Sequence, residues 1–170
     1  VIDTIVKYPC SMGFHIGRGV GCHAHPSPLD LTHAIMMSCN SYFCYAFRNI
    51  IDNPAYPDVT SAFSHWRDMV ESFGFGHKLG SDFPNELAGV LPSVKVYDRI
   101  HGKGKWKSLS IISLAIGQGE IGTTPLHLAN LAATIANRGY YYTPHIIKGA
   151  EDTVINTDYS KRHYTKVDTS

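Results

Sequence analysis

The sequence predicts a mainly α-helical fold with a few short strands (α+β), and three observations carry this prediction. Apolar residues recur at helical spacing between residues 58 and 73, and a second apolar segment with capping residues covers 124–139. The aromatic segment 140–149 has the composition of a strand. The 170 residues are 44% hydrophobic and 17% charged, which is typical of a single globular domain with its own core.

The N-terminal segment, residues 1–28, is rich in Gly, His and Cys and has no hydrophobic period. We expect a loop there, with at most one short strand. A helix is predicted to begin at Leu31, because apolar residues follow at helical spacing and Asp30 can cap the first turn. A second helix, 43–51, should end before Asn53-Pro54, because the residue before a proline disfavours helical geometry.

The longest helix is predicted over residues 58–73, with Asp58 as its cap and Gly74 and Gly76 after its end. Turn residues dominate the connection over 76–93, so little regular structure is expected there. Residues 108–116 are mostly apolar, and their periodicity does not distinguish a strand from a short helix.

The last helix is predicted to begin after Thr124, with Pro125 as its first residue, and to end at Gly139. Because it is apolar on most faces, we expect it to be buried. A strand follows over 140–149. Thr143-Pro144 restricts this strand to the edge of a sheet, because proline lacks the N–H that a central strand needs.

Composition and charge exclude several classes of function. The formal net charge is +1, so there is no electrostatic basis for binding nucleic acid. The sequence contains no run of 18 apolar residues, the length needed to span a membrane, and no secretory signal is visible. The glycines at 17, 19 and 21 do not follow a clear strand and are not followed by Lys-Ser/Thr, so they are not a phosphate loop. The basic segment 101–107 is interpreted as a solvated loop.

Ser38, Cys39 and Asn40 lie at the predicted junction of the first two helices, flanked by methionines and aromatics. Small residues often pack where two helices meet, and that explanation needs no function. If the junction faces a cleft, the hydroxyl of Ser38 can pass a proton, and the amide of Asn40 can both donate to and accept from a peptide-like ligand. Ser-x-Asn alone is too short to decide.

Four cysteines, Cys10, Cys22, Cys39 and Cys44, leave the redox compartment open. Cys22 and His25 have the Cys-x-x-His spacing that can place two ligands on one tetrahedral metal ion, and Cys10 and Cys39 would complete the set. The same residues could instead form a Cys10–Cys22 disulfide or remain free buried thiols.

Three segments combine into one pattern: SCNSYF at 38–43, GFGHKLGSDFPNE at 74–86, and LAIGQGEIGTTPLHLANLAATIANRG at 114–139. In this order and at these separations they resemble the transpeptidase domain of class B penicillin-binding proteins, of the penicillin-binding protein 2 type. The third segment is long and specific, and the resemblance covers roughly residues 22–148.

The resemblance implies that the parent is a peptidoglycan D,D-transpeptidase. Enzymes of this family acylate a serine with the D-Ala-D-Ala end of a stem peptide and transfer the acyl group to an amine on a neighbouring strand. Their motifs are Ser-x-x-Lys with the nucleophile, Ser-x-Asn, and Lys-Ser/Thr-Gly. Ser38 and Asn40 match the second motif; the implied roles are proton relay near the leaving group for Ser38 and a hydrogen bond to the substrate amide and the motif lysine for Asn40.

The other two motifs are absent from the 170 residues: no serine is followed by lysine three positions on, and Lys148-Gly149 lacks the middle residue of Lys-Thr-Gly. In the family they precede Ser-x-Asn and follow the last helix, so both are expected just beyond the two ends of this chain. We therefore expect an internal fragment without acyl-transfer activity. Its expected organisation is one partial transpeptidase domain (1–170), with a loop-rich Cys/His segment (1–28), a helical core (29–139), and a strand with a polar tail (140–170).

The family domain is a five-stranded antiparallel sheet surrounded by helices, and most of its strands lie near the two ends of the domain. The resemblance thus implies the helical part of the penicillin-binding protein/serine β-lactamase-like fold, with its sheet-facing apolar surface uncovered. It also implies a parent anchored on the periplasmic side of the bacterial inner membrane, with the anchor outside this chain. The implied partners are stem peptides, β-lactams and the cell-elongation machinery.

Some relatives of this type hold a zinc ion beside Ser-x-Asn, with the middle residue of the motif as one ligand, and that residue is Cys39 here. The resemblance therefore places zinc on an equal footing with the disulfide and the free thiols, which stay open; the expected ligands are Cys10, Cys22, His25 and Cys39, with His23 as the substitute for His25. Cys44 is interpreted as a core residue. Two other functions stay open: a non-catalytic module of the same fold that senses a ligand, and a small zinc-stabilised structural domain.

Overall fold

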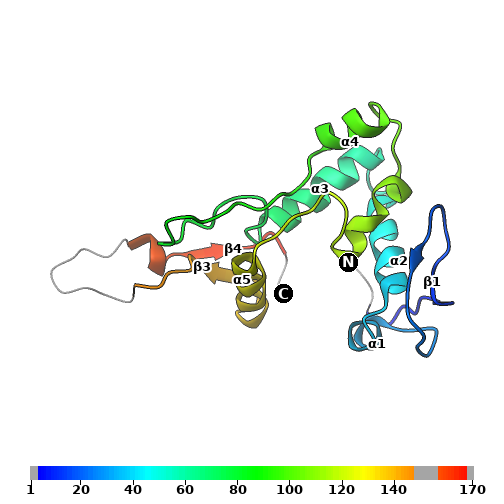
Figure 1. The fold of residues 1–170 in the computed structure, drawn as a ribbon, viewed down its shortest axis with the longest axis horizontal. Coiled ribbons are helices and arrows are strands. Elements are labelled where there is room, and N and C mark those ends of the chain that lie inside the picture. The colour runs from blue at the N-terminus through cyan, green and yellow to red at the C-terminus, as the bar shows by residue number, and fades with distance from the viewer. Residues whose placement is uncertain (1–3, 148–156, 168–170) are drawn as a thin grey trace. The chain divides into compact units, whose positions relative to one another are not determined.

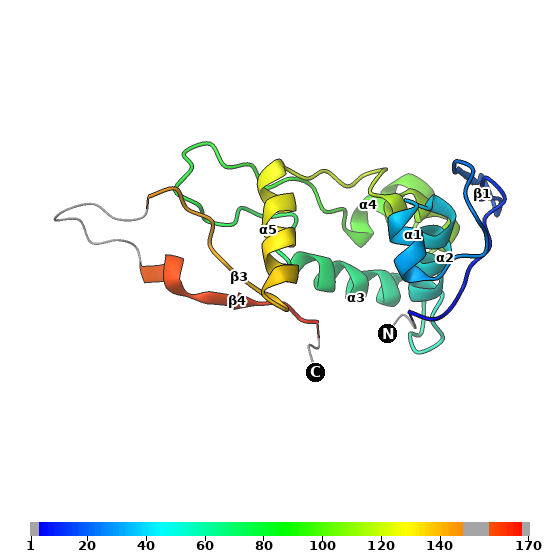
Figure 2. The same ribbon diagram turned by 90° about the horizontal axis from the view of Figure 1, so that it is seen from below.

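The computed structural model describes residues 4–147 and 157–167, which form two compact units. Unit 1 comprises Val1–Ser64 and Ser93–Gly119, and unit 2 comprises His65–Pro92 and Glu120–Ser170. The elements of the described residues, in chain order, are β1 (Gly13–Phe14), β2 (Val20–Gly21), α1 (Leu31–Met36), α2 (Asn40–Ile51), α3 (Val59–Glu71), α4 (Val94–His101), the 3-10 helix η1 (Ser108–Ile116), α5 (Pro125–Ala136), β3 (Tyr140–Tyr142), the 3-10 helix η2 (Thr157–Ser160) and β4 (Arg162–Tyr164) (Figure 1, Figure 2).

The predicted mainly α fold is confirmed, and α1, α3 and α5 begin where capping chemistry predicts. Asp30 accepts a hydrogen bond from the backbone N–H of His33 (3.0 Å) at the start of α1, and Asp58 accepts one from Ser61 (2.7 Å) at the start of α3. Thr124 accepts one from the backbone N–H of His127 (3.3 Å) at the start of α5. These caps satisfy N–H groups that have no partner inside the helix.

Several elements differ from the prediction or were not predicted. Segment 1–28, expected to contain at most one short strand, forms the two strands of the β1–β2 hairpin. Helix α4, which ends at His101 and is followed by Gly102 as its C-cap, was not expected, although Val94 and Tyr97 stand at helical spacing. Segment 108–116, for which the sequence left a strand and a short helix open, is a 3-10 helix. Strand β4 lies within the segment that was expected to be a polar tail. The strand predicted over 140–149 is realised only as β3, and its residues 148–149 lie outside the described residues.

Unit 1 is organised around α2, which packs against η1, β1 and β2. Figure 1 shows β1 running beside α2. Three fully buried aromatic residues form a second part of its core: the Phe63 ring lies 5.3 Å from that of Tyr97 and 5.5 Å from that of Trp106. The indole N–H of Trp106 donates to Asp98 (2.9 Å), so burying this ring leaves no polar atom unsatisfied.

In unit 2, α5 packs against β3, which pairs antiparallel with β4. The expectation that α5 is buried is wrong for its apolar residues: Leu128 and Ile135 are 53% and 65% exposed. The buried residues of α5 are polar, namely His127, Asn130 and Thr134. They can be buried because each is hydrogen-bonded; Asn130, for example, donates to the carbonyl of Phe73 (3.0 Å).

The connection between α3 and Pro92 is organised by Glu86. Its carboxylate accepts hydrogen bonds from the backbone N–H groups of Leu79, Gly80 and Ser81, and from the hydroxyl of Ser81. The side chain thus replaces the hydrogen bonds that a helix or strand would supply to this segment. No helix among the described residues is long and apolar enough to cross a membrane.

Candidate functional site

Ser38 occupies the turn between α1 and α2. Its φ of +50° lies in the left-handed region, which non-glycine residues seldom adopt. The turn is held by two backbone hydrogen bonds, from Ser38 to the carbonyl of Ile35 (3.1 Å) and from Cys39 to that of Ala34 (2.9 Å). Because of this turn, the side chain of Ser38 is exposed while the next residue, Cys39, is fully buried.

Cys39 caps α2, and Asn40 is its first residue. The sulfur of Cys39 accepts a hydrogen bond from the backbone N–H of Tyr42 (3.4 Å), and this cap starts the helix three residues earlier than predicted. The side-chain amide of Asn40 donates to the carbonyl of Gly21 (2.9 Å). Asn40 therefore has a partner within the chain that the sequence did not reveal.

Apolar packing supports this junction from one side. Cys39, Ala34 and Tyr42 are fully buried and share one hydrophobic cluster, against which Met37 packs. Met36, in contrast, is 64% exposed. The rigid support behind Ser38 and Asn40 thus comes from the start of α2 and from one of the two flanking methionines.

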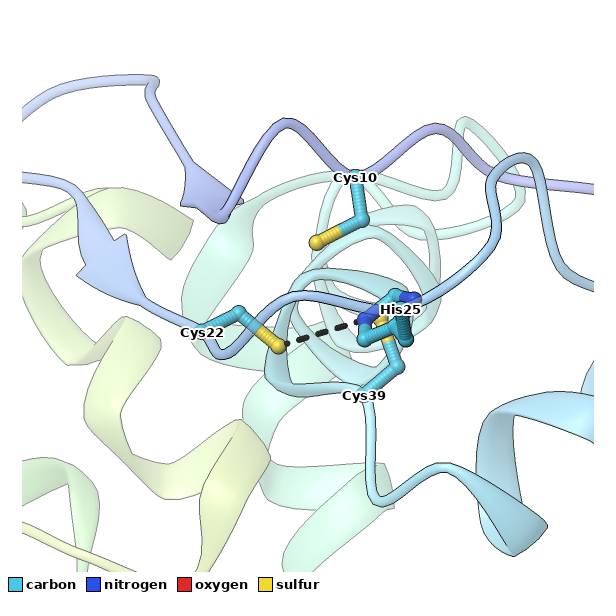
Figure 3. A group of neighbouring side chains, drawn as sticks. All are labelled: Cys10, Cys22, His25 and Cys39. Carbon is cyan, nitrogen blue, oxygen red and sulfur yellow. Dashed lines mark hydrogen bonds between the residues drawn. The ribbon is translucent and has the colours of Figure 1, made fainter.

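The four residues predicted as metal ligands lie together in unit 1. Figure 3 shows the side chains of Cys10, Cys22, His25 and Cys39 directed toward a common point. Their three sulfur atoms and a ring nitrogen of His25 all lie within 4.8 Å of one another. His25, and not His23, is the histidine of this cluster, although their rings lie close together, with centroids 5.3 Å apart. Cys44 is fully buried and is not one of the four, so its interpretation as a core residue is confirmed.

Two tethers hold the Cys10 and Cys22 segments against the start of α2. The hydroxyl of Ser41 donates to the carbonyl of Pro9 (2.9 Å), next to Cys10, and Asn40 donates to the carbonyl of Gly21, next to Cys22. The β1–β2 hairpin brings the two segments together, and the backbone N–H of Cys22 bonds to the carbonyl of Met12 (2.9 Å). The residues that follow Cys39 thus position the other two cysteines.

The surroundings of Cys22 stabilise its thiolate. Burial by itself would raise its pKa, but its hydrogen bond with His25 and those from the backbone N–H groups of Asn40 and Ser41 lower the pKa to about 7. These N–H groups belong to the first turn of α2, where free donors favour negative charge. Burial raises the pKa of Cys39 to about 11 in the metal-free chain.

The tautomer of His25 suits metal binding. Its Nδ1 donates to the carbonyl of Pro26 (2.7 Å), so the lone pair of Nε2 faces the sulfur of Cys22, 3.4 Å away. The hydrogen bond to Pro26 raises the pKa of His25, with a smaller contribution from Cys22. A histidine ligand commonly has its second nitrogen fixed by such a carbonyl.

The donor set fits a tetrahedral zinc ion. With zinc–sulfur bonds of about 2.3 Å, two ligand sulfurs of a tetrahedral site lie ~3.8 Å apart. The ligand atoms here lie within 4.8 Å of one another without any ion, so small side-chain rotations would bring them to that geometry. Three thiols and an imidazole are also the donor types that zinc prefers.

Comparison with known proteins identifies relatives of this chain. The family described as "Penicillin binding protein transpeptidase domain" matches residues 16–170. The peptidoglycan D,D-transpeptidase MrdA of Acinetobacter baumannii is 34% identical over 120 residues, which are 71% of this chain and 16% of the relative. The chain therefore spans only a small part of the length of this curated relative.

Solved structures share the fold. Pseudomonas aeruginosa PBP2 in complex with WCK 5153 matches with a TM-score of 0.71 and 20% identity, covering 98% of this chain and 34% of that one. The complex between PBP2 and MreC from Helicobacter pylori matches with a TM-score of 0.59 and 22% identity, covering 94% of this chain and 29% of that one. At these identities the likeness concerns the fold.

Proposed function

Because the chain belongs to the family of penicillin-binding protein transpeptidase domains, we propose that it is the part of a peptidoglycan D,D-transpeptidase that carries the Ser-x-Asn motif. The family match over residues 16–170 carries this proposal. The exposed position of Ser38 beside the start of α2 supports it. A helix holds a catalytic group in position more precisely than a flexible loop does.

The two motif residues have chemistry suited to acyl transfer. When a serine attacks the D-Ala-D-Ala amide, a proton must reach the departing nitrogen. The hydroxyl of Ser38 can accept one proton while it donates another, so it can relay a proton to that atom. The amide of Asn40 uses one hydrogen for the carbonyl of Gly21, and its oxygen and second hydrogen can orient the substrate amide.

The longer parent protein supplies the nucleophile. The 170 residues contain neither Ser-x-x-Lys nor Lys-Ser/Thr-Gly, so on their own they form no acyl-enzyme. The parent acts on peptidoglycan stem peptides at the periplasmic side of the inner membrane and is acylated by β-lactams. It works with the cell-elongation machinery, as the Helicobacter pylori relative solved with MreC illustrates.

Labelling with a fluorescent penicillin tests this proposal. The longer protein should acquire a covalent label that survives a denaturing gel, and an excess of unlabelled penicillin should prevent it. The 170-residue chain should stay unlabelled under the same conditions. A stable serine adduct on the 170 residues would contradict the inferred inactivity, and an unlabelled but folded longer protein would contradict the transpeptidase assignment.

We infer that Cys10, Cys22, His25 and Cys39 bind one zinc ion. Zinc in such a site acts as a structural cross-link. These residues would then tie the N-terminal loop, which already packs Tyr8 and Phe14 against α2, to the turn that carries Ser38. Tethering by Ser41 and Asn40 and the orientation of His25 support this inference.

Elemental analysis tests the metal site. Purified protein should contain about one zinc per chain, and removing it with a chelator should lower the thermal unfolding temperature. A folded, reduced protein that contains no metal, and does not take up added zinc, would contradict the site.

A further inference from the structure

We propose that Cys10 and Cys22 form a reversible disulfide in the metal-free chain, so that the cluster is also a site of thiol–disulfide exchange with low-molecular-weight disulfides such as oxidised glutathione. The effect on metal binding rests on the zinc site proposed above. The thiol chemistry itself depends only on where the cysteines lie.

The distances between the sulfurs permit the bond. The sulfurs of Cys10, Cys22 and Cys39 lie within 4.8 Å of one another, and an S–S bond is about 2.05 Å long. Closing this gap requires side-chain rotation and a small backbone adjustment. Cys10 and Cys22 lie on loop segments that flank the short β1–β2 hairpin, outside any regular element, and this allows the adjustment.

Cys22 is the thiol that reacts first. It is half-buried, whereas Cys39 is fully buried and Cys10 nearly so, so a dissolved disulfide reaches Cys22 most easily. The Nε2 atom of His25, 3.4 Å from its sulfur, is placed to take the thiol proton.

Cys10 completes the reaction in preference to Cys39. The sulfur of Cys39 is the cap of α2, where it accepts the N–H of Tyr42, and bonding it to Cys22 would remove that cap. Cys10 caps no helix: it lies on a loop segment, and its backbone N–H donates to the hydroxyl of Ser27 (2.8 Å).

The reaction balances in two steps. The thiolate of Cys22 attacks one sulfur of oxidised glutathione, forming a mixed disulfide as the glutathione S–S bond breaks and one glutathione thiolate leaves. The thiolate of Cys10 then attacks the sulfur of Cys22 and displaces the second glutathione thiolate. Two protein thiols are oxidised, one glutathione disulfide is reduced to two thiols, and both leaving thiolates equilibrate with solvent protons.

The disulfide would prevent metal binding at the cluster. It removes two of four ligands and leaves only His25 and Cys39, too few for a tetrahedral structural site. Bound metal would in turn protect the thiolates from oxidation. The redox state of this loop would thus determine whether a metal ion ties it to the turn carrying Ser38.

The test compares zinc-loaded and chelator-treated protein in oxidised glutathione, with free thiols alkylated and disulfides mapped by mass spectrometry without reduction. The metal-free chain should give a Cys10–Cys22 disulfide, with Cys39 and Cys44 alkylated after denaturation. Oxidation of the zinc-loaded chain should be slower, on the order of tenfold or more. Cys10→Ser should accumulate the glutathione adduct on Cys22, and Cys44→Ser, the matched control, should behave as the parent chain.

The outcomes separate the two proposals. If the protein binds no zinc but forms the Cys10–Cys22 disulfide, the metal site fails and the exchange chemistry stands. If zinc binds but the metal-free chain forms no disulfide, or joins Cys22 to Cys39 instead, the exchange proposal is overturned. Circular dichroism of Cys10→Ser verifies that this variant is folded, and a folded variant without the adduct on Cys22 also overturns it.

Discussion

Replacing Glu86 by glutamine should lower the free energy of unfolding of unit 2 by about 2–4 kcal/mol. Glu86 is only 8% exposed, and its carboxylate accepts four hydrogen bonds, three from backbone N–H groups and one from the hydroxyl of Ser81. Glutamine offers one acceptor oxygen and turns an NH₂ group toward the remaining donors. About two of the four bonds are lost, and each charge-assisted bond contributes ~1–2 kcal/mol where its donor can regain water.

The same carboxylate makes stability depend on pH. Burial by itself raises the pKa of Glu86, but the hydrogen bonds from Leu79, Ser81 and Gly80 lower it below its ordinary value. Because the folded pKa lies below the unfolded one, this stabilisation is fully present above the unfolded pKa of about 4.3 and is lost as the pH falls through the folded pKa. Glu86→Gln should therefore reduce the acid sensitivity of the protein.

Urea unfolding at pH 7 and at lower pH, followed by circular dichroism, measures both effects. Amide hydrogen exchange at residues 79–81 should accelerate in the variant, which localises the change. Glu71→Gln is the matched control: Glu71 pairs with Arg67 (2.9 Å), and its side chain is 40% exposed, so the loss should stay below about 0.5 kcal/mol. Equal losses in the two variants would refute the role assigned to the Glu86 hydrogen bonds.

Two further predictions concern α5 and the cluster. The exposed Leu128 and Ile135 of α5 predict that the chain self-associates through this face, and Leu128→Ser combined with Ile135→Ser should reduce that association in analytical ultracentrifugation; a parent chain that stays monomeric, or unchanged association of the variant, would exclude this face as a contact. Cys39→Ser should lower zinc content by on the order of tenfold or more, whereas Cys44→Ser should leave it unchanged. Equal metal loss in both would remove Cys39 from the ligand set.

The helices could be predicted from the sequence because their signals are local. Asp30, Asp58 and Thr124 each lie three residues before the N–H group that they cap, so the interaction can be read from spacing alone. The start of α2 was missed because its cap is a cysteine sulfur, which is an uncommon acceptor. Strand β4 was missed because its residues are polar and its pairing with β3 is non-local.

The cluster could be predicted only as a set of residue types. Cys-x-x-His spacing identified Cys22 and His25 as candidate ligands. The resemblance to the family supported Cys39 as a further ligand, because Cys39 is the middle residue of Ser-x-Asn. The tethers from Ser41 to Pro9 and from Asn40 to Gly21 join residues 32 and 19 positions apart, and no spacing rule reveals such contacts. The buried polar residues His127 and Asn130 of α5 were missed for a similar reason, because each has a partner 50 or more positions away, at His77 and Phe73.

The acylation rate of the longer protein carrying Asn40→Ala tests the central claim most directly. If Asn40 orients the reacting amide, the second-order rate constant for acylation by a β-lactam should fall on the order of 10²- to 10³-fold. Ser41→Ala is the control, because it removes the neighbouring tether to Pro9 without changing the motif, and it should alter the rate much less. A folded Asn40→Ala protein that acylates at the parent rate, or no more slowly than Ser41→Ala, would contradict the assignment of Ser-x-Asn to the active site.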